Sequence, residues 1–307
     1  MKAMVFPGQG SQQVGMLAEF YDAFDCFSAV FKTASDVLGY DLWHLIQSGP
    51  QEQLNLTENT QPSLLACSVA LWRVWSELGG AEPDYMAGHS LGEWSALVCA
   101  DVLSLEDALR LVQLRGRYMQ EAVPVGEGAM AAIIGLDDQK IIDICQQQEG
   151  VVAAVNFNAP GQVVIAGVKA AVDTSCEVCK EAGAKRAMPL AVSAPFHSSL
   201  MQPAADRLAD DLQNIAFSSP RVPVVHNVTA QTESSGDAIR NLIIEQIASP
   251  VRWTECVQTL AAAGVSNTFE CGPGKVLGTM IKRIDKTLSC SALDSIDAMQ
   301  AAIESTR

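Results

Sequence analysis

Short apolar runs alternate along the chain with longer segments in which apolar residues recur at helical spacing. Ala3–Phe6 is an apolar run that ends at Pro7-Gly8, which predicts a buried strand opening into a tight loop. A second run, Tyr85–Ala87, stops at Gly88 and leads into helical spacing over 91–98. Strand, sharp turn and helix in this order are typical of an α/β fold. The same periodicities predict helices at 64–78, 105–119 and 201–212, and short strands at 222–226 and 267–270.

The middle of the chain follows a different order. Its pattern predicts, in turn, a strand, a helix, two strands, a helix and a strand, at 128–134, 137–148, 151–156, 162–166, 168–182 and 185–192. This βαββαβ order is that of the ferredoxin-like split unit. Because α/β elements resume after it, we predict that residues 124-194 are a ferredoxin-like insertion into a larger α/β domain made of residues 1-123 and 195-307.

Composition and charge exclude several classes of protein. Of 307 residues, 49% are hydrophobic, which is enough to form a core and excludes disorder. The formal net charge is −15, whereas a protein that binds nucleic acid needs a cationic surface to displace phosphate counterions. We therefore expect no nucleic acid partner, and any acidic partner must use a local basic patch.

The cysteines and the N-terminus bear on location. Nine cysteines, an odd number, are scattered through apolar segments, as expected of reduced thiols in a cytoplasmic protein. Cys176 and Cys179 are the closest pair, but they fall in a helical pattern without a second pair or a nearby histidine, so we expect no metal. No run approaches a membrane span of about 20 residues, and the apolar run before Pro7 is too short for a signal peptide. The sequence predicts a cytoplasmic protein with no membrane contact.

Gly88-His-Ser-Leu-Gly92 is a G-x-S-x-G pentapeptide between a predicted strand and a predicted helix. The glycines allow a strained turn that exposes the Ser90 hydroxyl, and the helix start supplies N–H groups to a developing oxyanion. We predict that Ser90 is a nucleophile. The alternative is an ordinary N-cap between glycines.

A serine nucleophile needs a base, and four histidines are available. His89 adjoins Ser90 and is expected to point away from it, His44 fits a core or helix-face position, and His226 lies at a strand end. His197 follows the predicted insertion, where a cleft is expected, and is by elimination the candidate base. No acidic residue between Ser90 and His197 has a distinctive setting, so an amide or a backbone carbonyl can orient the imidazole instead.

Arg115 falls on the apolar stripe of the predicted helix at 105–119. An arginine directed inward must meet an anion, because an unpaired buried charge costs several kcal/mol. Guanidinium geometry suits a carboxylate held by two parallel hydrogen bonds. We predict a substrate with a free carboxylate, and the alternative is a structural ion pair with a carboxylate of the protein.

The loop Pro7–Gln12 differs from a phosphate-binding loop because it lacks the following Lys-Ser/Thr and does not fit G-x-G-x-x-G. A loop at the end of a strand can instead contribute an N–H group to an oxyanion hole.

With these residues in place the chain resembles the malonyl-CoA:acyl carrier protein transacylases of bacterial fatty acid synthesis and the discrete acyltransferases of polyketide synthases. Besides Arg115, the resemblance rests on six ordered motifs that span nearly the whole chain: Phe6–Gln12, Gly88–Glu93, Asn156–Gln162, Ala194–His197, Gln246 before Pro250–Trp253, and Glu270–Lys275. It implies an α/β-hydrolase-like large domain with an inserted ferredoxin-like (βαββαβ) small domain.

The resemblance also implies roles for individual residues. Ser90 is acylated, His197 acts as base and then as acid, and a main-chain carbonyl at Gln246 orients the histidine. Backbone N–H groups of Gln9 and Leu91 form the oxyanion hole. The implied substrate-binding residues are Arg115, Met119, Asn156 and Phe196. Leu91 and Phe196 resemble members that select malonyl over methylmalonyl groups.

The implied reaction is ping-pong transfer from malonyl-CoA, with release of coenzyme A, to the phosphopantetheine thiol of an acidic acyl carrier protein. No metal or cofactor is expected, and we expect a monomer. The candidate basic residues for docking the carrier protein are Lys185, Arg186, Lys275, Lys282, Arg283 and Lys286. Two alternatives remain open here: a serine thioesterase or esterase that passes the acyl group to water, and a catalytically silent docking module.

Overall fold

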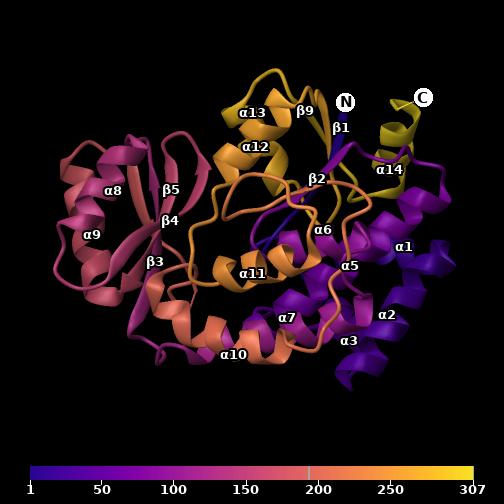
Figure 1. Cartoon of the computed structure of the whole chain (residues 1–307), viewed down its shortest axis with the longest axis horizontal. Coiled ribbons are helices and arrows are strands. Elements are labelled where there is room, and N and C mark those ends of the chain that lie inside the picture. Colours follow the sequence, from indigo (N-terminus) through magenta and orange to yellow (C-terminus); the bar gives the residue numbers. More distant parts are fainter. Residues whose placement is uncertain (193, 307) are drawn as a thin grey trace.

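The computed structural model describes residues 1–192 and 194–306, and it contains two separate β-sheets (Figure 1). Ser193 and Arg307, which belong to the predicted domain ranges, lie outside the described residues. The fold is therefore a mixed α/β fold with one parallel sheet and one antiparallel sheet, as the sequence pattern predicts.

The larger lobe is built on the parallel sheet, whose strand order is β7-β2-β1-β8-β9. Its strands are β1 (Lys2–Phe6), β2 (Tyr85–Gly88), β7 (Val224–Val225), β8 (Asn267–Glu270) and β9 (Ser289–Ala292). Helices cover both faces of this sheet, so β1 is apolar at successive positions. Met4 and Phe6 pack into one core and Ala3 and Val5 into another on the opposite face.

The helices of this lobe fall into two groups along the chain. Before the strands of the antiparallel sheet lie α1 (Ala18–Ala23), α2 (Asp25–Leu38), α3 (Leu42–Ser48), α4 (Gln51–Leu54), α5 (Thr57–Glu77), α6 (Leu91–Cys99) and α7 (Leu105–Glu121). After these strands lie the 3-10 turn η1 (Ser199–Met201), α10 (Gln202–Leu212), α11 (Gly236–Gln246), α12 (Trp253–Ala262), α13 (Val276–Ile284) and α14 (Ile296–Glu304). None of the helices in residues 1–192 and 194–306 is both long and apolar enough for a transmembrane segment.

The smaller lobe, at the left of Figure 1, is a four-stranded antiparallel sheet of order β4-β5-β3-β6 with two helices on one face. Its elements are β3 (Gly128–Ile134), α8 (Asp138–Gln146), β4 (Val152–Ala159), β5 (Gln162–Val168), α9 (Lys169–Glu181) and β6 (Arg186–Pro189). The predicted βαββαβ order is confirmed, and the lobe has its own apolar core. Strand β4 also contacts the larger lobe, because the Phe157 N–H donates to Val251 O (3.0 Å) and the Val251 N–H to Val155 O (2.8 Å).

Two predicted elements differ in extent from the structure. Helix α5 begins at Thr57 and not at residue 64, because its first turns carry polar side chains that are nevertheless buried, among them Thr60 and Gln61. The strand predicted at 222–226 is limited to Val224–Val225, since Pro223 lacks an N–H and His226 and Asn227 turn away into buried polar contacts. Both differences involve buried polar residues, which the apolar pattern does not reveal.

Candidate active site

Ser90 lies in a strained turn between β2 and α6. Its backbone angles are φ 52° and ψ −108°, an arrangement that L-residues rarely adopt and that is typical of a nucleophile elbow. The flanking glycines are required by close packing. A Cβ at Gly88 would lie 1.9 Å from the Gly92 carbonyl carbon, and one at Gly92 would lie 2.0 Å from Phe6 O. The turn projects Ser90 from the carboxyl end of β2, beside the end of β1.

His197 lies next to Ser90, although 107 residues separate them. Its Nε2 is 2.7 Å from Ser90 Oγ, and its Nδ1 is 2.9 Å from the main-chain oxygen of Gln246. In the described part of the chain no Asp or Glu contacts His197. A carbonyl oxygen can accept a hydrogen bond but cannot donate one, so the contact with Gln246 O places the proton on Nδ1 and leaves Nε2 free to accept the serine proton.

Burial lowers the pKa of His197 to about 3, and the positive charge of Arg115 acts in the same direction against the opposing hydrogen bond to Gln246. The imidazole is therefore neutral near pH 7, which is the form that a general base requires.

Arg115 is on the buried face of α7 and is fully covered. Its Nη1 donates to Gln61 Oε1 (2.8 Å), and its Nη2 donates to Gln246 Oε1 (3.0 Å) and to Ser90 Oγ (3.3 Å). Among the described residues no carboxylate forms an ion pair with it, so the structural ion pair considered from the sequence is absent there. Burial lowers the pKa of Arg115 to about 10, and the nearby charge of Glu93 opposes this effect.

A cavity of about 410 Å³ opens in front of Ser90 and His197. Both lobes line it: the loop after β1 and the Ser90 turn face strands β3 and β4 and the segment that follows β6. Three further predicted residues, Met119, Asn156 and Phe196, lie on its wall. Arg115 does not line the cavity but lies behind Ser90, which its Nη2 contacts.

Gln9 and Leu91 lie on either side of Ser90, at the end of β1 and at the start of α6. Within the described residues neither backbone N–H donates to another protein group. Gln9 is exposed and its side chain accepts from Gln61 Nε2 (3.2 Å), whereas Leu91 is buried. Two N–H groups without partners beside a nucleophile are available to stabilise an oxyanion.

The other histidines lie apart from the Ser90 hydroxyl. His44 is exposed on α3, as a helix-face residue, and His226 is buried against Glu93 (Nδ1 to Oε1, 2.7 Å). The His89 ring packs on Trp253 and bonds to Asn158 Oδ1 (2.7 Å), although it also lines the cavity. The His89 and His226 rings therefore have partners of their own, and His44 lies on an exposed helix face.

Sequence reasoning missed three residues that support the site: Gln61, Glu93 and Asn227. Gln61 holds Arg115, and Asn227 Oδ1 accepts the Ser90 N–H (2.8 Å). Glu93 is 1% exposed and bonds to His226, Asn227 and Gln246. The one available signal was the position of Glu93 at the end of the serine motif, one helical turn after the nucleophile.

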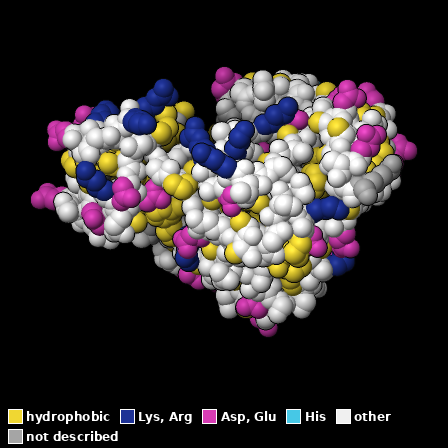
Figure 2. All heavy atoms as spheres, turned by 90° about the horizontal axis from the view of Figure 1, so that it is seen from above, with side chains coloured by type: hydrophobic (Ala, Val, Ile, Leu, Met, Phe, Trp, Pro, Cys, Tyr) yellow, Lys and Arg dark blue, Asp and Glu magenta, His cyan; other side chains and the backbone are white. Residues whose placement is uncertain are grey.

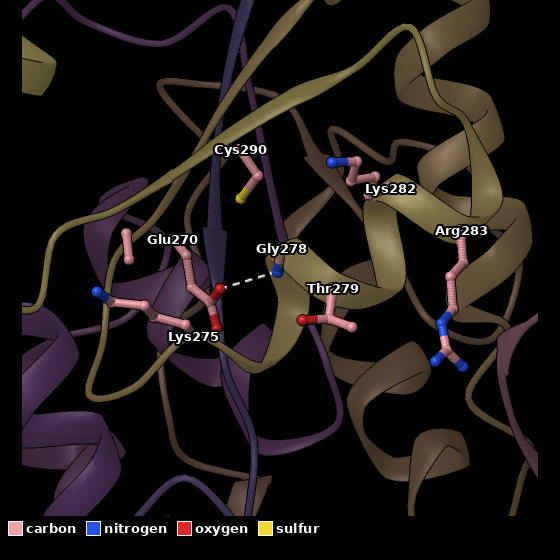
Figure 3. A pocket seen from close by; sticks show the side chains of 8 residues that line it. Glu270, Lys275, Gly278, Thr279, Lys282, Arg283 and Cys290 are labelled. Carbon is pink, nitrogen blue, oxygen red and sulfur yellow. Dashed lines mark hydrogen bonds between the residues drawn. The ribbon is translucent and has the colours of Figure 1, made fainter.

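Basic side chains gather around the notch between the two lobes (Figure 2). Of the predicted docking residues, Lys275, Lys282 and Arg283 line a surface hollow of about 350 Å³ at α13 (Figure 3). Glu270, at the base of this hollow, accepts the N–H groups of residues 276–278 and caps α13. Arg283 donates to Gln162 Oε1 of the smaller lobe (2.7 Å). Lys185, Arg186 and Lys286 are exposed.

No cluster of metal-binding side chains occurs among residues 1–192 and 194–306. Cys176 and Cys179 are free, buried thiols on α9.

Comparison with known proteins identifies the family. The acyl transferase domain family matches residues 3–300. The chain belongs to this family. It is 58% identical over 304 residues to the malonyl CoA-acyl carrier protein transacylase of Escherichia coli K12, covering 98% of each chain, and 43% identical to that of Bacillus subtilis, covering 99% of this chain and 97% of the relative.

Solved structures of high similarity carry the same kind of name as the sequence relatives. The fold is similar to an acyl carrier protein S-malonyltransferase from Vibrio cholerae (54% identity, TM-score 0.96, covering 98% and 99%). It is also similar to a type II PKS acyl-carrier protein's malonyl-transacylase, solved in complex with that carrier protein (56% identity, TM-score 0.97, covering 99% of each chain). The resemblance predicted from the motifs is confirmed.

Proposed function

We propose that this acyltransferase moves the malonyl group of malonyl-CoA to the phosphopantetheine thiol of an acyl carrier protein through a malonyl-serine intermediate. The observation that carries the proposal is the contact of Ser90 Oγ with both His197 Nε2 and Arg115 Nη2 at one cavity. The first contact supplies a base for the nucleophile, and the second places a cation where the free carboxylate of a malonyl group can reach it. The relatives carry this activity in their names.

In the first half-reaction Ser90 Oγ attacks the thioester carbon and its proton passes to His197 Nε2. The N–H groups of Gln9 and Leu91 stabilise the resulting oxyanion. As the tetrahedral intermediate collapses, the carbon–sulfur bond breaks and the same proton passes to the sulfur of coenzyme A. The second half-reaction is the reverse with a different thiol: the phosphopantetheine sulfur attacks the ester, and His197 returns a proton to Ser90.

Arg115 gives the site its preference for malonyl groups. Its Nη2 bonds to Ser90 Oγ in the free enzyme, and once that oxygen is esterified the malonyl carboxylate takes over this hydrogen-bonding position. Met119, Asn156 and Phe196 form the wall around the acyl group.

The chain organisation fits this chemistry. The larger lobe is α/β-hydrolase-like and comprises residues 1-123 and 195-307, and residues 124-194 form a ferredoxin-like insertion. The strand order β4-β5-β3-β6 supports the second description, because that fold places the first and third strands of its βαββαβ unit at the centre. The insertion closes one side of the cavity and returns the chain at His197.

The basic residues at the notch receive the carrier protein. Lys275, Lys282, Arg283 and Lys286 lie on or beside α13, and Lys185 and Arg186 lie on the smaller lobe. An acidic carrier protein requires such a local patch, because the enzyme has a net charge of −15 and would otherwise repel it. No observation favours transfer to water or a silent docking role over this proposal.

Intact mass spectrometry tests the function directly. Mixing the protein with malonyl-CoA is expected to add about 86 Da, the mass of a malonyl group in place of a proton, through covalent catalysis. Ser90→Ala is expected to show no adduct, and adding carrier protein should discharge the parent enzyme. An adduct that persists in Ser90→Ala would overturn the assignment.

A further inference from the structure

Glu93 is a buried carboxylate that does not line the cavity, yet it bonds to groups that contact Ser90, His197 and Arg115. Its Oε1 is 2.7 Å from His226 Nδ1, and its Oε2 accepts the Asn227 N–H (2.9 Å) and Gln246 Nε2 (2.8 Å). Moving a carboxylate from water into the protein interior is costly, so we looked for a role of Glu93 in the arrangement of the site.

Two of these partners lead directly to the reacting groups. Asn227 accepts the Ser90 N–H (2.8 Å) and donates to Gly88 O (2.7 Å), which holds the strained serine turn. Gln246 bonds to His197 through its main-chain oxygen and to Arg115 through its side chain.

The Gln246 amide can face Arg115 in two ways, and only one is favourable. In the structure Nε2 points to Glu93 Oε2 and also lies 3.1 Å from Ser90 O, which turns Oε1 toward Arg115 Nη2 (3.0 Å). The opposite orientation would place two N–H donors against the guanidinium, which cannot accept a hydrogen bond. Asn227 Oδ1 also accepts from Nε2 (3.2 Å), but Glu93 makes the shortest of these three contacts and is the acidic one, so it contributes most to the orientation that supports Arg115.

The amide also keeps the carboxylate at a distance from the guanidinium. If Glu93 touched Arg115, a strong ion pair would occupy the donors that a substrate carboxylate needs. Instead Arg115 meets the neutral amides of Gln61 and Gln246, and among the described residues its charge has no direct carboxylate partner.

Building on the proposed function, we propose that Glu93 is a positioning residue for malonyl specificity. It fixes the Gln246 amide so that Arg115 is aimed at the Ser90 oxygen and stays free to bind the substrate carboxylate.

The first test is Glu93→Met, assayed for transfer of malonyl and acetyl groups from their coenzyme A esters. Methionine removes both carboxylate oxygens at a similar side-chain length, so Gln246 Nε2 loses its bond to Glu93 Oε2 and the amide is held less firmly. The malonyl-to-acetyl ratio of kcat/KM should fall by about tenfold or more, the scale for a misplaced positioning group. If Glu93 acted only through its charge, neutralising it would strengthen the attraction of Arg115 for malonate. An unchanged or increased ratio would therefore overturn the proposal.

The second test exchanges the two side chains in Glu93→Gln/Gln246→Glu. This variant keeps the net charge and an amide–carboxylate hydrogen bond, but it places the carboxylate directly on Arg115. If the neutral amide between Glu93 and Arg115 were unimportant, the exchange would retain the malonyl preference. We expect the variant to melt near the parent temperature and to show a lower malonyl-to-acetyl ratio of kcat/KM.

A third variant tests the proposal even if the first two variants fail to fold. Gln246→Met leaves Glu93 with its other two donors and preserves the main-chain carbonyl that faces His197. It removes the side-chain amide, and with it the bonds to Arg115, Ser90 O and Asn227. It should lower the malonyl-to-acetyl ratio, and an unchanged ratio would contradict the role of the amide. Failure of the parent enzyme to form a malonyl adduct would instead count against the proposed function.

Discussion

At the scale of single residues, the site depends on how burial affects two basic groups. His197 is made neutral, whereas Arg115 keeps its charge because amide oxygens and the more distant Glu93 support it. One becomes an acceptor of protons and the other an anion-binding group, although both touch the same serine oxygen. Two predictions belong to this scale.

Removing the guanidinium tests the role of Arg115 in specificity. Arg115→Ala should reduce kcat/KM for malonyl-CoA by an amount equivalent to about 2 to 4 kcal/mol, the scale for truncating one partner of a buried charge pair. Acetyl-CoA should react as well as with the parent or better, since a neutral acyl group no longer faces an unpaired cation. Steady-state kinetics with both esters checks this, and an unchanged ratio would assign Arg115 a structural role only.

The low pKa of His197 predicts an unusual pH dependence. A histidine of ordinary pKa would be protonated below about pH 6.5 and acylation would slow. With a pKa of about 3, the imidazole remains neutral and the rate of Ser90 acylation should stay level down to about pH 5. Rapid-quench mass spectrometry at a series of pH values measures this rate of acylation. A midpoint near 6.5 would show that His197 titrates normally in the free enzyme.

At the scale of secondary-structure elements, contact between two helices places Arg115, which touches Ser90. Helix α7 brings in Arg115 and packs closely on α5, which brings in Gln61. The contact depends on Gly116, where a Cβ would lie 2.5 Å from Thr57 O in the backbone of α5. Arg115 precedes this glycine, so the spacing of the two helices and the position of the guanidinium are linked.

Gly116→Ala should therefore affect both stability and specificity. Forcing the helices apart is expected to cost about 1 to 3 kcal/mol of unfolding free energy, as overpacking generally does. The malonyl-to-acetyl ratio should also fall, because Arg115 shifts with α7. Thermal unfolding and kinetics measure the two effects, with Gln113→Ala at a partly exposed position of the same helix as the control. A variant as stable as this control would mean that the helices adjust without strain.

At the scale of the whole molecule, charge is distributed unevenly over a strongly acidic protein. Lys and Arg side chains gather at the notch between the lobes (Figure 2). Arg283 of α13 bonds to Gln162 of the smaller lobe. Long-range attraction to an acidic partner would thus act at the notch. This attraction should weaken as the salt concentration rises, because salt screens charges.

Charge reversal at α13 tests this surface. Lys282→Glu/Lys286→Glu should raise KM for the carrier protein, most strongly at low salt, and leave acylation by malonyl-CoA unchanged. Lys32→Glu, on exposed surface of α2, is the matched control and should behave like the parent. Equal carrier-protein kinetics for the α13 variant and the control would place docking elsewhere.

Features that depend on local pattern can be predicted from the amino-acid sequence. Short-range spacing predicts the strand, turn and helix around Ser90, the inward arginine of α7 and the βαββαβ order of residues 128–189. It does so because the backbone fixes how often a side chain returns to the same face, every 2 residues in a strand and every 3.6 in a helix. The histidine was found by elimination among four, which works because few side chains can act as a base near pH 7.

Tertiary structure alone decided which groups support the site. Glu93, Asn227 and Gln61 come from three segments, and each is a buried polar residue whose partners are distant in sequence. The carbonyl that orients His197 is main chain and carries no residue signature, so the absence of a suitable acid left a carbonyl as one possibility and only the family resemblance indicated Gln246. A buried polar group is satisfied by whichever donor or acceptor the fold brings within about 3 Å. That distance is a property of packing and not of sequence spacing.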